Sequence, residues 1–245
     1  MKYYYDFHIH SCLSPCADND NTPNNIAGMA QISGLNIVAL TDHNTVKNCP
    51  AFLKAAKRFN IIALAGMELT TSEDIHVVFL FENLNDAINF NDEVQNRRIL
   101  IKNRVEIFGE QLILDEQDNI IESEEHLLSN ATTISIEECV QLANKYGAVC
   151  YPAHIDREAN GIISVLGTVP HNLGFKCLEF KDKQNIESYK QKYNLEGYIF
   201  LTDSDAHYLE NIPDKDAFIE IEGENLSEET FISRLFNKLK GGGSE

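Results

Sequence analysis

The chain has 245 residues, of which 43% are hydrophobic and 24% are charged, a composition typical of a globular protein. Its formal net charge of −18 at pH 7 argues against tight binding to a long nucleic acid, which needs Lys and Arg to neutralise phosphates. The sequence has no apolar run long enough to span a membrane and no recognisable signal peptide at its start, so we expect a cytoplasmic location and no membrane partner.

The six cysteines are expected to be reduced in the cytoplasm. Cys12, Cys16 and Cys49 could hold a soft metal ion, but they form no CxxC pair, and small half-buried thiols are the simpler interpretation. The last residues, 241–245, have the composition of a flexible tail or linker remnant. The folded unit is therefore expected over residues 1–240.

The predicted elements of the first half alternate between strands and helices. An apolar strand covers about residues 2–7, and a helix follows over 23–33, where Thr22 is its N-cap and Pro23 its first residue. Further strands are predicted at 36–40, 61–66 and 75–81, and helices near 51–59 and 84–94. Residues 102–133 break this pattern and are interpreted as an excursion with a hairpin around 116–118.

The second half continues the alternation. Ser135 and Glu138 form a capping box that opens a helix to about residue 146. Strands are predicted at 148–154, 175–180, 198–207 and 217–221, and a last helix ends near residue 240. Near-continuous apolar strands of this kind indicate a parallel sheet covered by helices, either open or closed into a barrel. No internal repeat is present, and we predict a single domain because the 102–133 excursion is too short to form a separate one.

Side chains that can bind metal ions follow most of the predicted strands. Six of the eight histidines belong to this set, whereas His126 and His171 do not. In barrels of alternating strands and helices, catalytic groups gather at the carboxyl ends of the strands. The set comprises His8, His10, Asp42, His43, Glu68, His76, His154, Asp203, Asp205 and His207.

Each of these motifs alone is weak evidence, because a His-x-His pair or a single Glu is often structural. Their combination fits metal chemistry better. Residues two apart in an extended segment point to one side, so His8 and His10 can chelate one ion, and Asp205 and His207 can do the same. Imidazole and carboxylate ligands together suit zinc, manganese or iron.

The order His-x-His, Thr-Asp-His-Asn, Glu, His, Pro-Ala-His and Ser-Asp-Ala-His over residues 8–207 resembles the PHP (polymerase and histidinol phosphatase) family of metal-dependent phosphoesterases. The resemblance implies an α/β fold, a distorted (β/α)7 barrel, with three divalent ions at the carboxyl ends of its strands. It implies a first ion at His8, His10, Glu68 and Asp205, a second at Glu68, His76 and His154, and a third at Asp18, His43 and His207. Asp20 is the neighbouring alternative to Asp18.

The resemblance leads us to predict an enzyme that hydrolyses a small phosphomonoester, nucleotide-like or other, through a hydroxide that bridges the ions. Asp42 is expected to orient His43 or a neighbouring ligand, and Asp203 is a candidate acid. Arg157, Lys181 and Arg104 are candidates to bind the substrate. Arg157 is favoured because it follows His154 closely, although a solvated surface charge is the alternative.

Two other functions stay open. An exonuclease that acts on a short oligonucleotide end would fit the same residues, and so would a non-enzymatic regulatory metal-binding protein. The second is disfavoured because every ligand position of the family is filled. The excursion at 102–133 is expected to cap the barrel and to set substrate choice, and a stabilising hairpin is the alternative.

Overall fold

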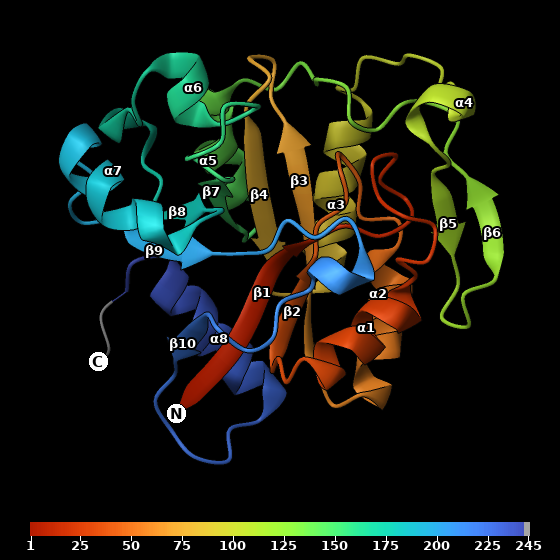
Figure 1. The fold of residues 1–245 in the computed structure, drawn as a ribbon, viewed down its shortest axis with the longest axis horizontal. Helices are drawn as coiled ribbons and strands as arrows, with labels where there is room; N and C mark the ends of the chain where they lie inside the picture. Colours follow the sequence, from red (N-terminus) through yellow and green to blue (C-terminus); the bar gives the residue numbers. More distant parts are fainter. Residues whose placement is uncertain (243–245) are drawn as a thin grey trace.

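The structure is a computed structural model that describes residues 1–242; residues 243–245, the end of the predicted tail, lie outside the described residues. It has an α/β fold with a six-stranded sheet, a parallel strand pair and an antiparallel hairpin (Figure 1). The sheet has the order β10 (Phe218–Glu220), β1 (Lys2–Ile9), β2 (Ile37–Leu40), β3 (Ile62–Thr70), β4 (His76–Phe81) and β7 (Val149–Pro152). The parallel pair is β8 (Cys177–Phe180) with β9 (Ile199–Thr202), and the hairpin is β5 (Leu112–Leu114) with β6 (Ile120–Ser123).

The strand directions determine which ends of the strands meet. β1, β2 and β3 are parallel, whereas β4 is antiparallel to both of its neighbours, β3 and β7. Only residues 71–75 separate β3 from β4, and so short a link can form a hairpin but not a parallel crossover. The start of β4, at His76, therefore lies beside the carboxyl ends of the other strands.

The sheet is curled, but continuous backbone hydrogen bonding between strands does not close it into a barrel. The segment after β7 is joined to β8 by a backbone hydrogen bond from Ile155 N to Glu179 O of 2.8 Å. The segment after β9 is joined to the end of β1 by an isolated bridge between Ile9 and Ala206. The α/β prediction is confirmed, whereas a regular (β/α)7 barrel is not, because β4 is reversed and β8–β9 is attached only by isolated contacts.

The helices form two layers, one on each side of the sheet (Figure 1). Residues of α1, α2, α3 and α5 belong to one apolar core, and residues of α8 to the other. The predicted caps are present, since Thr22 accepts a hydrogen bond from Asn25 N and Ser135 forms a capping box with Glu138. The helices of these layers are α1 (Pro23–Ile32), α2 (Cys49–Arg58), α3 (Leu84–Gln95), α5 (Ile136–Lys145) and α8 (Glu228–Leu239).

Three helices were not predicted from the sequence: α4 (Val105–Phe108), α6 (Ile162–Leu166) and α7 (Ile186–Tyr193). α4 and α6 are too short to show a helical period. α7 has no fully buried residue, so it lacks the apolar stripe on which such a prediction depends. Within residues 1–242, no helix is both long and apolar enough to cross a membrane.

Because side chains alternate between the two faces of a strand, the polar groups near the strand ends lie on one face of the sheet. In β3, Leu64 belongs to the core on the α8 side, and Glu68 shares its face because it lies an even number of residues away. His76 shares a face with Val78 in β4 in the same way. In β1 a register shift separates Asp6 from Ile9, so the simple alternation breaks just where His8 lies.

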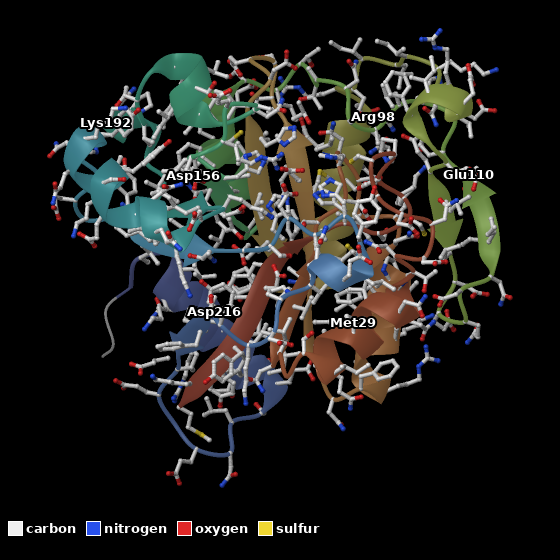
Figure 2. All side chains as sticks on the ribbon, viewed as in Figure 1. Met29, Arg98, Glu110, Asp156, Lys192 and Asp216 are labelled. Carbon is white, nitrogen blue, oxygen red and sulfur yellow. The ribbon has the colours of Figure 1, made fainter. Side chains whose placement is uncertain are left out.

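The excursion folds as the predicted hairpin, with α4 before it, and it packs beside the loop that follows β1 (Figure 1). Leu112 and Leu114 pack with Cys12, and Ile113 packs with Leu13. Figure 2 labels Arg98 and Glu110 on this side of the molecule. The hairpin thus supports the loop that carries the residues after His10.

Candidate metal centre

The predicted ligands converge at the end of the curled sheet where β1, β2 and β3 terminate, although they come from segments far apart in the chain. His8 and His10 lie at the end of β1, Glu68 near the end of β3, and His76 at the start of β4. His43 follows β2, His154 follows β7, and Asp205 and His207 follow β9. His8, His10, His43, Glu68, His154 and Asp205 are buried, and His76 and His207 are partly exposed.

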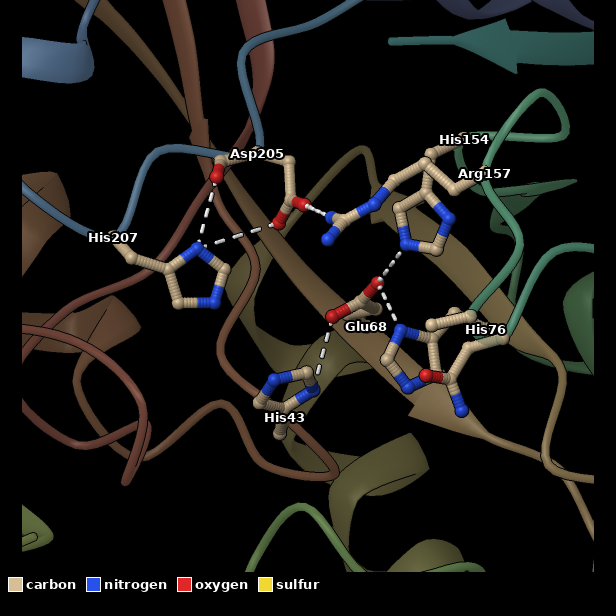
Figure 3. A pocket seen from close by; sticks show the side chains of 9 residues that line it. His43, Glu68, His76, His154, Arg157, Asp205 and His207 are labelled. Atoms are coloured by element: carbon tan, nitrogen blue, oxygen red, sulfur yellow. Dashed lines mark hydrogen bonds and ion pairs between the residues drawn. The ribbon is translucent and has the colours of Figure 1, made fainter. Parts of the chain in front are cut away.

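Glu68 is the centre of this cluster (Figure 3). Its Oε1 lies 2.7 Å from Nδ1 of His76 and 3.2 Å from Nε2 of His154. Its Oε2 lies 2.9 Å from Nδ1 of His43 and 3.3 Å from Nε2 of His10. Each carboxylate oxygen therefore faces a different set of imidazoles, as a carboxylate that bridges two ions would.

His8, His10, Glu68 and Asp205 form a group of four side chains whose ligand atoms lie within 4.8 Å of one another. Nε2 of His8 and Nε2 of His10 are 3.2 Å apart. In each ring the other nitrogen donates elsewhere, His8 Nδ1 to Glu179 and His10 Nδ1 to Ser14 Oγ, both at 3.0 Å. In the neutral tautomers that donate through Nδ1, the two Nε2 atoms would face each other as lone pairs, an arrangement that a shared cation would stabilise.

Other buried atoms of the cluster also fit metal ions. Among the described residues, Glu68 Oε2, His43 Nδ1 and His76 Nδ1 have no partner with hydrogen-bond geometry, although His43 Nδ1 lies within ion-pair distance of Glu68 Oε2 and His76 Nδ1 within ion-pair distance of Glu68 Oε1. A buried polar atom without a partner is costly and therefore calls for an explanation. Imidazole nitrogens and carboxylate oxygens that point into a shared space are the donor set of zinc, manganese and iron sites.

The electrostatics of the cluster favour positive charge. Burial acts against the charged forms, but the imidazoles of His76, His8 and His43 hold the pKa of Glu68 well below its ordinary value. Burial would also lower the pKa of His8, yet the carboxylates of Glu179, Glu68 and Asp205 raise it well above its usual range. Burial lowers the pKa of His76 to about 4, so this ring is neutral near pH 7 and able to bind a metal ion.

The remaining two groups differ in part from the predicted ligand sets. His43 lies with Glu68 and His76, and it also lies with His10 and His207. The structure does not bring Asp18 into either group: it is exposed, and its carboxylate accepts a hydrogen bond from Asp20 N at 2.8 Å. Asp20 is exposed as well. His154 is not part of these groups but contacts Glu68 Oε1 at 3.2 Å.

Two supporting carboxylates orient the histidines. Both oxygens of Glu179 accept from His8 Nδ1 at 3.0 Å, which fixes the ring so that Nε2 faces the cluster. Asp42 accepts from Ser14 Oγ at 2.7 Å, and Ser14 Oγ accepts in turn from His10 Nδ1. Asp42 thus acts through Ser14 on His10. Glu179 and Ser14 were missed from the sequence, although a buried Glu inside the apolar strand at 175–180 was a usable signal.

The backbone is strained at two of the ligands. His154 has φ of 28° and Asp205 has φ of 48°, in the left-handed region that residues other than Gly rarely adopt. Such strain persists only where the surrounding structure enforces it, and it is common at functional sites.

The predicted catalytic and substrate-binding residues are distributed unevenly around the cluster. Arg157 lines the cavity and pairs with Asp205 Oδ2 (Figure 3). Lys181 donates to the backbone oxygen of Ser204, and Arg104 is the exposed N-cap of α4; neither lines the cavity. Asp203 is buried behind the lining residues, where its Oδ1 accepts from Phe7 N at 2.6 Å. Burial, together with Glu179 and Asp6, raises the pKa of Asp203 well above its ordinary value, and its role as an acid stays a prediction.

A cavity of about 120 Å³ opens from the cluster toward solvent (Figure 3). No residue of the 102–133 excursion lines it, so the expected cap is not formed by that segment. The hairpin packs on the loop after β1 instead, as the alternative interpretation predicts. The cavity is lined by His43, Glu68, His76, His154, Arg157, Ala159, Asn160, Asp205 and His207.

Comparisons with known proteins agree with this geometry. Residues 6–210 match the model of the PHP domain family. The chain is 29% identical over 99 residues to an uncharacterized protein of Methanocaldococcus jannaschii, a match that covers 37% of this chain and 58% of the relative. It is 34% identical over 83 residues to a 5'-3' exoribonuclease of Haemophilus influenzae, covering 33% of this chain and 29% of the relative. Neither match reaches two thirds of the relative's length.

Two solved structures share the fold over nearly the whole chain. The lesion-specific endonuclease Q of Pyrococcus furiosus has a TM-score of 0.68 at 17% identity, covering 99% of this chain and 57% of the endonuclease. A protein of Bifidobacterium adolescentis described as a metal-dependent phosphoesterase has a TM-score of 0.60 at 17% identity, covering 98% of this chain and 96% of that one. The chain thus spans little more than half of the endonuclease. Endonuclease Q has also been solved with a DNA duplex that carries an abasic lesion at its active site.

Proposed function

We propose that the chain, which belongs to the PHP domain family, is a metal-dependent phosphoric ester hydrolase that acts on a small phosphomonoester with three divalent ions bound at the cluster. The observation that carries this proposal is the convergence of eight predicted ligands, Glu68 among them, in one cluster. When bound, the ions would supply a nucleophilic oxygen at neutral pH and a positive field for the phosphoryl group.

The size of the cavity supports a substrate that enters by its phosphoryl end. A volume of about 120 Å³ corresponds to roughly four waters at ~30 Å³ each. Pockets that enclose a whole drug-sized ligand are larger, at roughly 300 Å³ or more. We infer that the phosphoryl group lies inside, against the cluster, and that the organic part of the substrate lies at the opening.

Arg157 is the proposed phosphoryl-orienting residue. It is the cation among the residues that line the cavity, and its side chain is 45% exposed, so it can turn from Asp205 toward a ligand. A guanidinium can donate two parallel hydrogen bonds to phosphate oxygens, which orients the group as well as attracting it. Once a metal ion neutralises Asp205, the competing attraction of Arg157 for that carboxylate would weaken.

The chemistry of the donor atoms indicates which metal ions the cluster could bind. Every proposed ligand in the cluster is an imidazole nitrogen or a carboxylate oxygen. Zinc, manganese and iron all accept such a set, and we propose these three metals as the candidates. His8, His10, Glu68 and Asp205 would hold the first ion, and Glu68, His76, His154 and His43 would surround the second.

A nuclease is the second candidate function. The relative from Haemophilus influenzae is named a 5'-3' exoribonuclease, and it is 34% identical over 83 residues of this chain. Endonuclease Q, which shares the fold, has been solved with duplex DNA, so these relatives give no support to the expectation that long nucleic acids are excluded. The net charge of −18 still favours a short oligonucleotide end over a long duplex.

The proposal is tested by phosphate release from protein loaded with zinc, manganese or iron. The panel contains nucleoside monophosphates, nucleotide bisphosphates, sugar phosphates, histidinol phosphate, short oligonucleotides and an abasic duplex. We expect turnover of at least one small ester, and its absence in a His8→Ala, Glu68→Ala double variant. His126→Ala is the matched control, because His126 lies outside the cluster.

The outcomes separate the alternatives. Turnover of oligonucleotides alone would replace the phosphatase by an exonuclease. Cleavage of the duplex at the lesion would replace it by an endonuclease. Protein that binds metal but turns over nothing in the panel would favour the regulatory alternative.

A further inference from the structure

The excursion carries an exposed apolar surface that the metal cluster does not use. Eight of the fifteen large hydrophobic residues that are exposed within residues 1–242 lie between 99 and 121, a stretch of less than a tenth of the chain. Leu100 is 60% exposed, Ile120 62% and Ile121 65%. Single exposed apolar side chains are ordinary, whereas a large group of them marks an interaction surface. We call residues 99–108 and 120–123, which include α4 and β6, the excursion face.

The excursion face also has an open strand edge. Just after β6, Glu124 N donates to Gln111 O on the β5 side at 2.9 Å, and Glu125 O accepts from Asn103 N at 2.8 Å. Because neighbouring residues of a strand point their backbone groups to opposite sides, residues 99–103 lie on the side away from β5. Within residues 1–242, the backbone of β6 itself pairs only with β5. An unpaired apolar edge can pair with another chain.

Charge is unevenly distributed over this part of the chain. Residues 105–125 contain eight acidic residues and no Lys or Arg, whereas residues 99–104 contain Lys102 and Arg104 and no acid. These two cations are exposed, and so are Glu122 and Glu125. Among the described residues, the ion pairs of this region include none of the four. The excursion face thus has unpaired cations in one segment and unpaired carboxylates in another.

A second copy of the chain has the complementary charges. Two copies related by a two-fold axis present the same face to each other, so each contact between them occurs twice. If Lys102 and Arg104 of each copy lie against the acidic segment of the other, both sets of contacts are attractive. Pairing of β6 with β6 would instead bring two acidic strands together, which is unfavourable.

The extent of the surface also suits a dimer. Of the 27 residues from 99 to 125, only residues 111–114 are buried. A protein–protein interface of standard size takes roughly 20–30 residues from each partner. The excursion and the segment just before it therefore offer enough accessible residues for such an interface.

We propose that the excursion face is the interface of a two-fold symmetric homodimer, in which the basic segment 99–104 of each copy lies against the acidic segment 122–125 of the other. Burial of side chains such as Leu100, Ile120 and Ile121 supplies the affinity, and the charge pairs determine the alignment. No residue of the face lines the cavity, so the cavity is not part of the interface. The inference goes beyond the proposed hydrolase and depends on neither its substrate nor its metals.

The test is sedimentation velocity and light scattering of the full chain from micromolar to hundreds of micromolar concentrations. We expect a reversible equilibrium between monomer and dimer. The double variants Lys102→Glu, Arg104→Glu and Glu122→Lys, Glu125→Lys should each raise the dissociation constant at least about 100-fold, because every charge contact between identical copies becomes repulsive. Mixed in equal amounts, the two variants should form a heterodimer, since both sets of contacts between them are attractive again.

Lys176→Glu with Lys192→Glu is the matched control, because it changes the charge equally and lies at β8 and α7. Figure 2 labels Lys192 and Glu110 on opposite sides of the molecule. This control should form dimers as wild type does, and recovery on mixing would also show that both reversed variants are folded. Wild-type protein that stays monomeric throughout, a dimer that either reversal leaves intact, or variants that stay apart when mixed would overturn the proposal.

Discussion

The metal cluster and the polar anchor beneath the hairpin both bury polar side chains, but they satisfy them differently. We define the hairpin anchor as Asn44, Asn48, Gln111 and Glu124. In this anchor, Asn48 donates to Leu112 O at 3.0 Å and accepts from Leu114 N at 2.9 Å. In the metal cluster, by contrast, Glu68 Oε2 has no partner with hydrogen-bond geometry among the described residues.

The difference lies in the kind of partner. The amides of the hairpin anchor bond mainly to backbone groups; Gln111, for example, donates to Glu124 O at 2.8 Å and accepts from Leu128 N at 2.8 Å. The cluster places side-chain acceptors and lone pairs against one another, 3.2 Å apart for the Nε2 atoms of His8 and His10. Polar groups paired with backbone stabilise the fold. Buried imidazole nitrogens and carboxylate oxygens that face one another are instead the donor set of a metal ion.

The largest expected effect comes from changing one buried glutamate in each region. Glu68→Gln keeps the shape but removes the charge that would bridge two ions, so we expect phosphatase activity to fall about a thousand-fold or more, or ~4 kcal/mol of transition-state stabilisation. Glu124→Gln is the matched control, because the Glu124 side chain is only 9% exposed but pairs with Lys47 and Arg98. Its activity should stay within about threefold of wild type. Equal losses in the two variants would remove the distinction between the regions.

Metal removal should affect the cluster alone. A ligand present at about 1,000 times its dissociation constant stabilises the folded state by ~4 kcal/mol. We therefore expect chelation to lower the melting temperature of the wild-type protein by several degrees and to leave Glu68→Gln nearly unchanged. Differential scanning calorimetry with and without chelator measures both. A melting temperature that does not respond to chelator in either protein would mean that the cluster binds no ion tightly.

Sequence patterns predicted the cluster better than they predicted the fold around it. His8, His10 and Asp205 could be assigned because strand-end motifs constrain local geometry and the chain has only eight histidines. The reversed direction of β4 was also accessible, since the short 71–75 link excludes a parallel crossover. It was obscured by the expectation of a regular barrel.

The supporting residues were harder to predict because their contacts are long-range. Glu179 reaches His8 across most of the chain, and nothing in its local sequence specifies that partner. Asp18 lies in a loop with several polar neighbours, and only the fold shows that its carboxylate is exposed and accepts a hydrogen bond from Asp20 N. Local sequence pattern therefore predicts which strands end at the metal cluster, whereas the loop conformation determines which of several neighbouring side chains points into it.

A smaller effect is expected for Asn48→Ala. The substitution leaves Leu114 N and Leu112 O without their side-chain partner, and an unsatisfied buried group costs about 1–3 kcal/mol. Urea unfolding of metal-free protein should show this loss as a lower midpoint. The number of bound ions should remain the same as in wild type. A change in metal stoichiometry instead would mean that the hairpin anchor belongs functionally to the metal cluster.

The smallest expected effect lies at the edge of the same region, in the surface pair of Glu138 and Arg97. Their two contacts are 2.8 and 3.0 Å long, and Glu138 also accepts from Ser135 N at 2.9 Å. The hydrogen bonds from Arg97 and Ser135 lower the pKa of Glu138 from 4.5 to about 2.

A lowered carboxyl pKa means that the unfolded chain binds the proton more tightly, so the contribution to stability is present above pH 4.5 and is lost as the pH falls toward 2. Since the Glu138 side chain is 41% exposed, solvent screening should keep the contribution below about 1 kcal/mol. The measurement is the unfolding free energy of wild type and Glu138→Gln between pH 2 and pH 7, with metal absent. The two curves should converge at the acid end, because there wild type carries the same neutral side chain. A constant difference between the two curves across the pH range would instead assign the effect to the helix cap, which the glutamine keeps only in part. It would also show that the charge of this exposed pair contributes nothing measurable to stability.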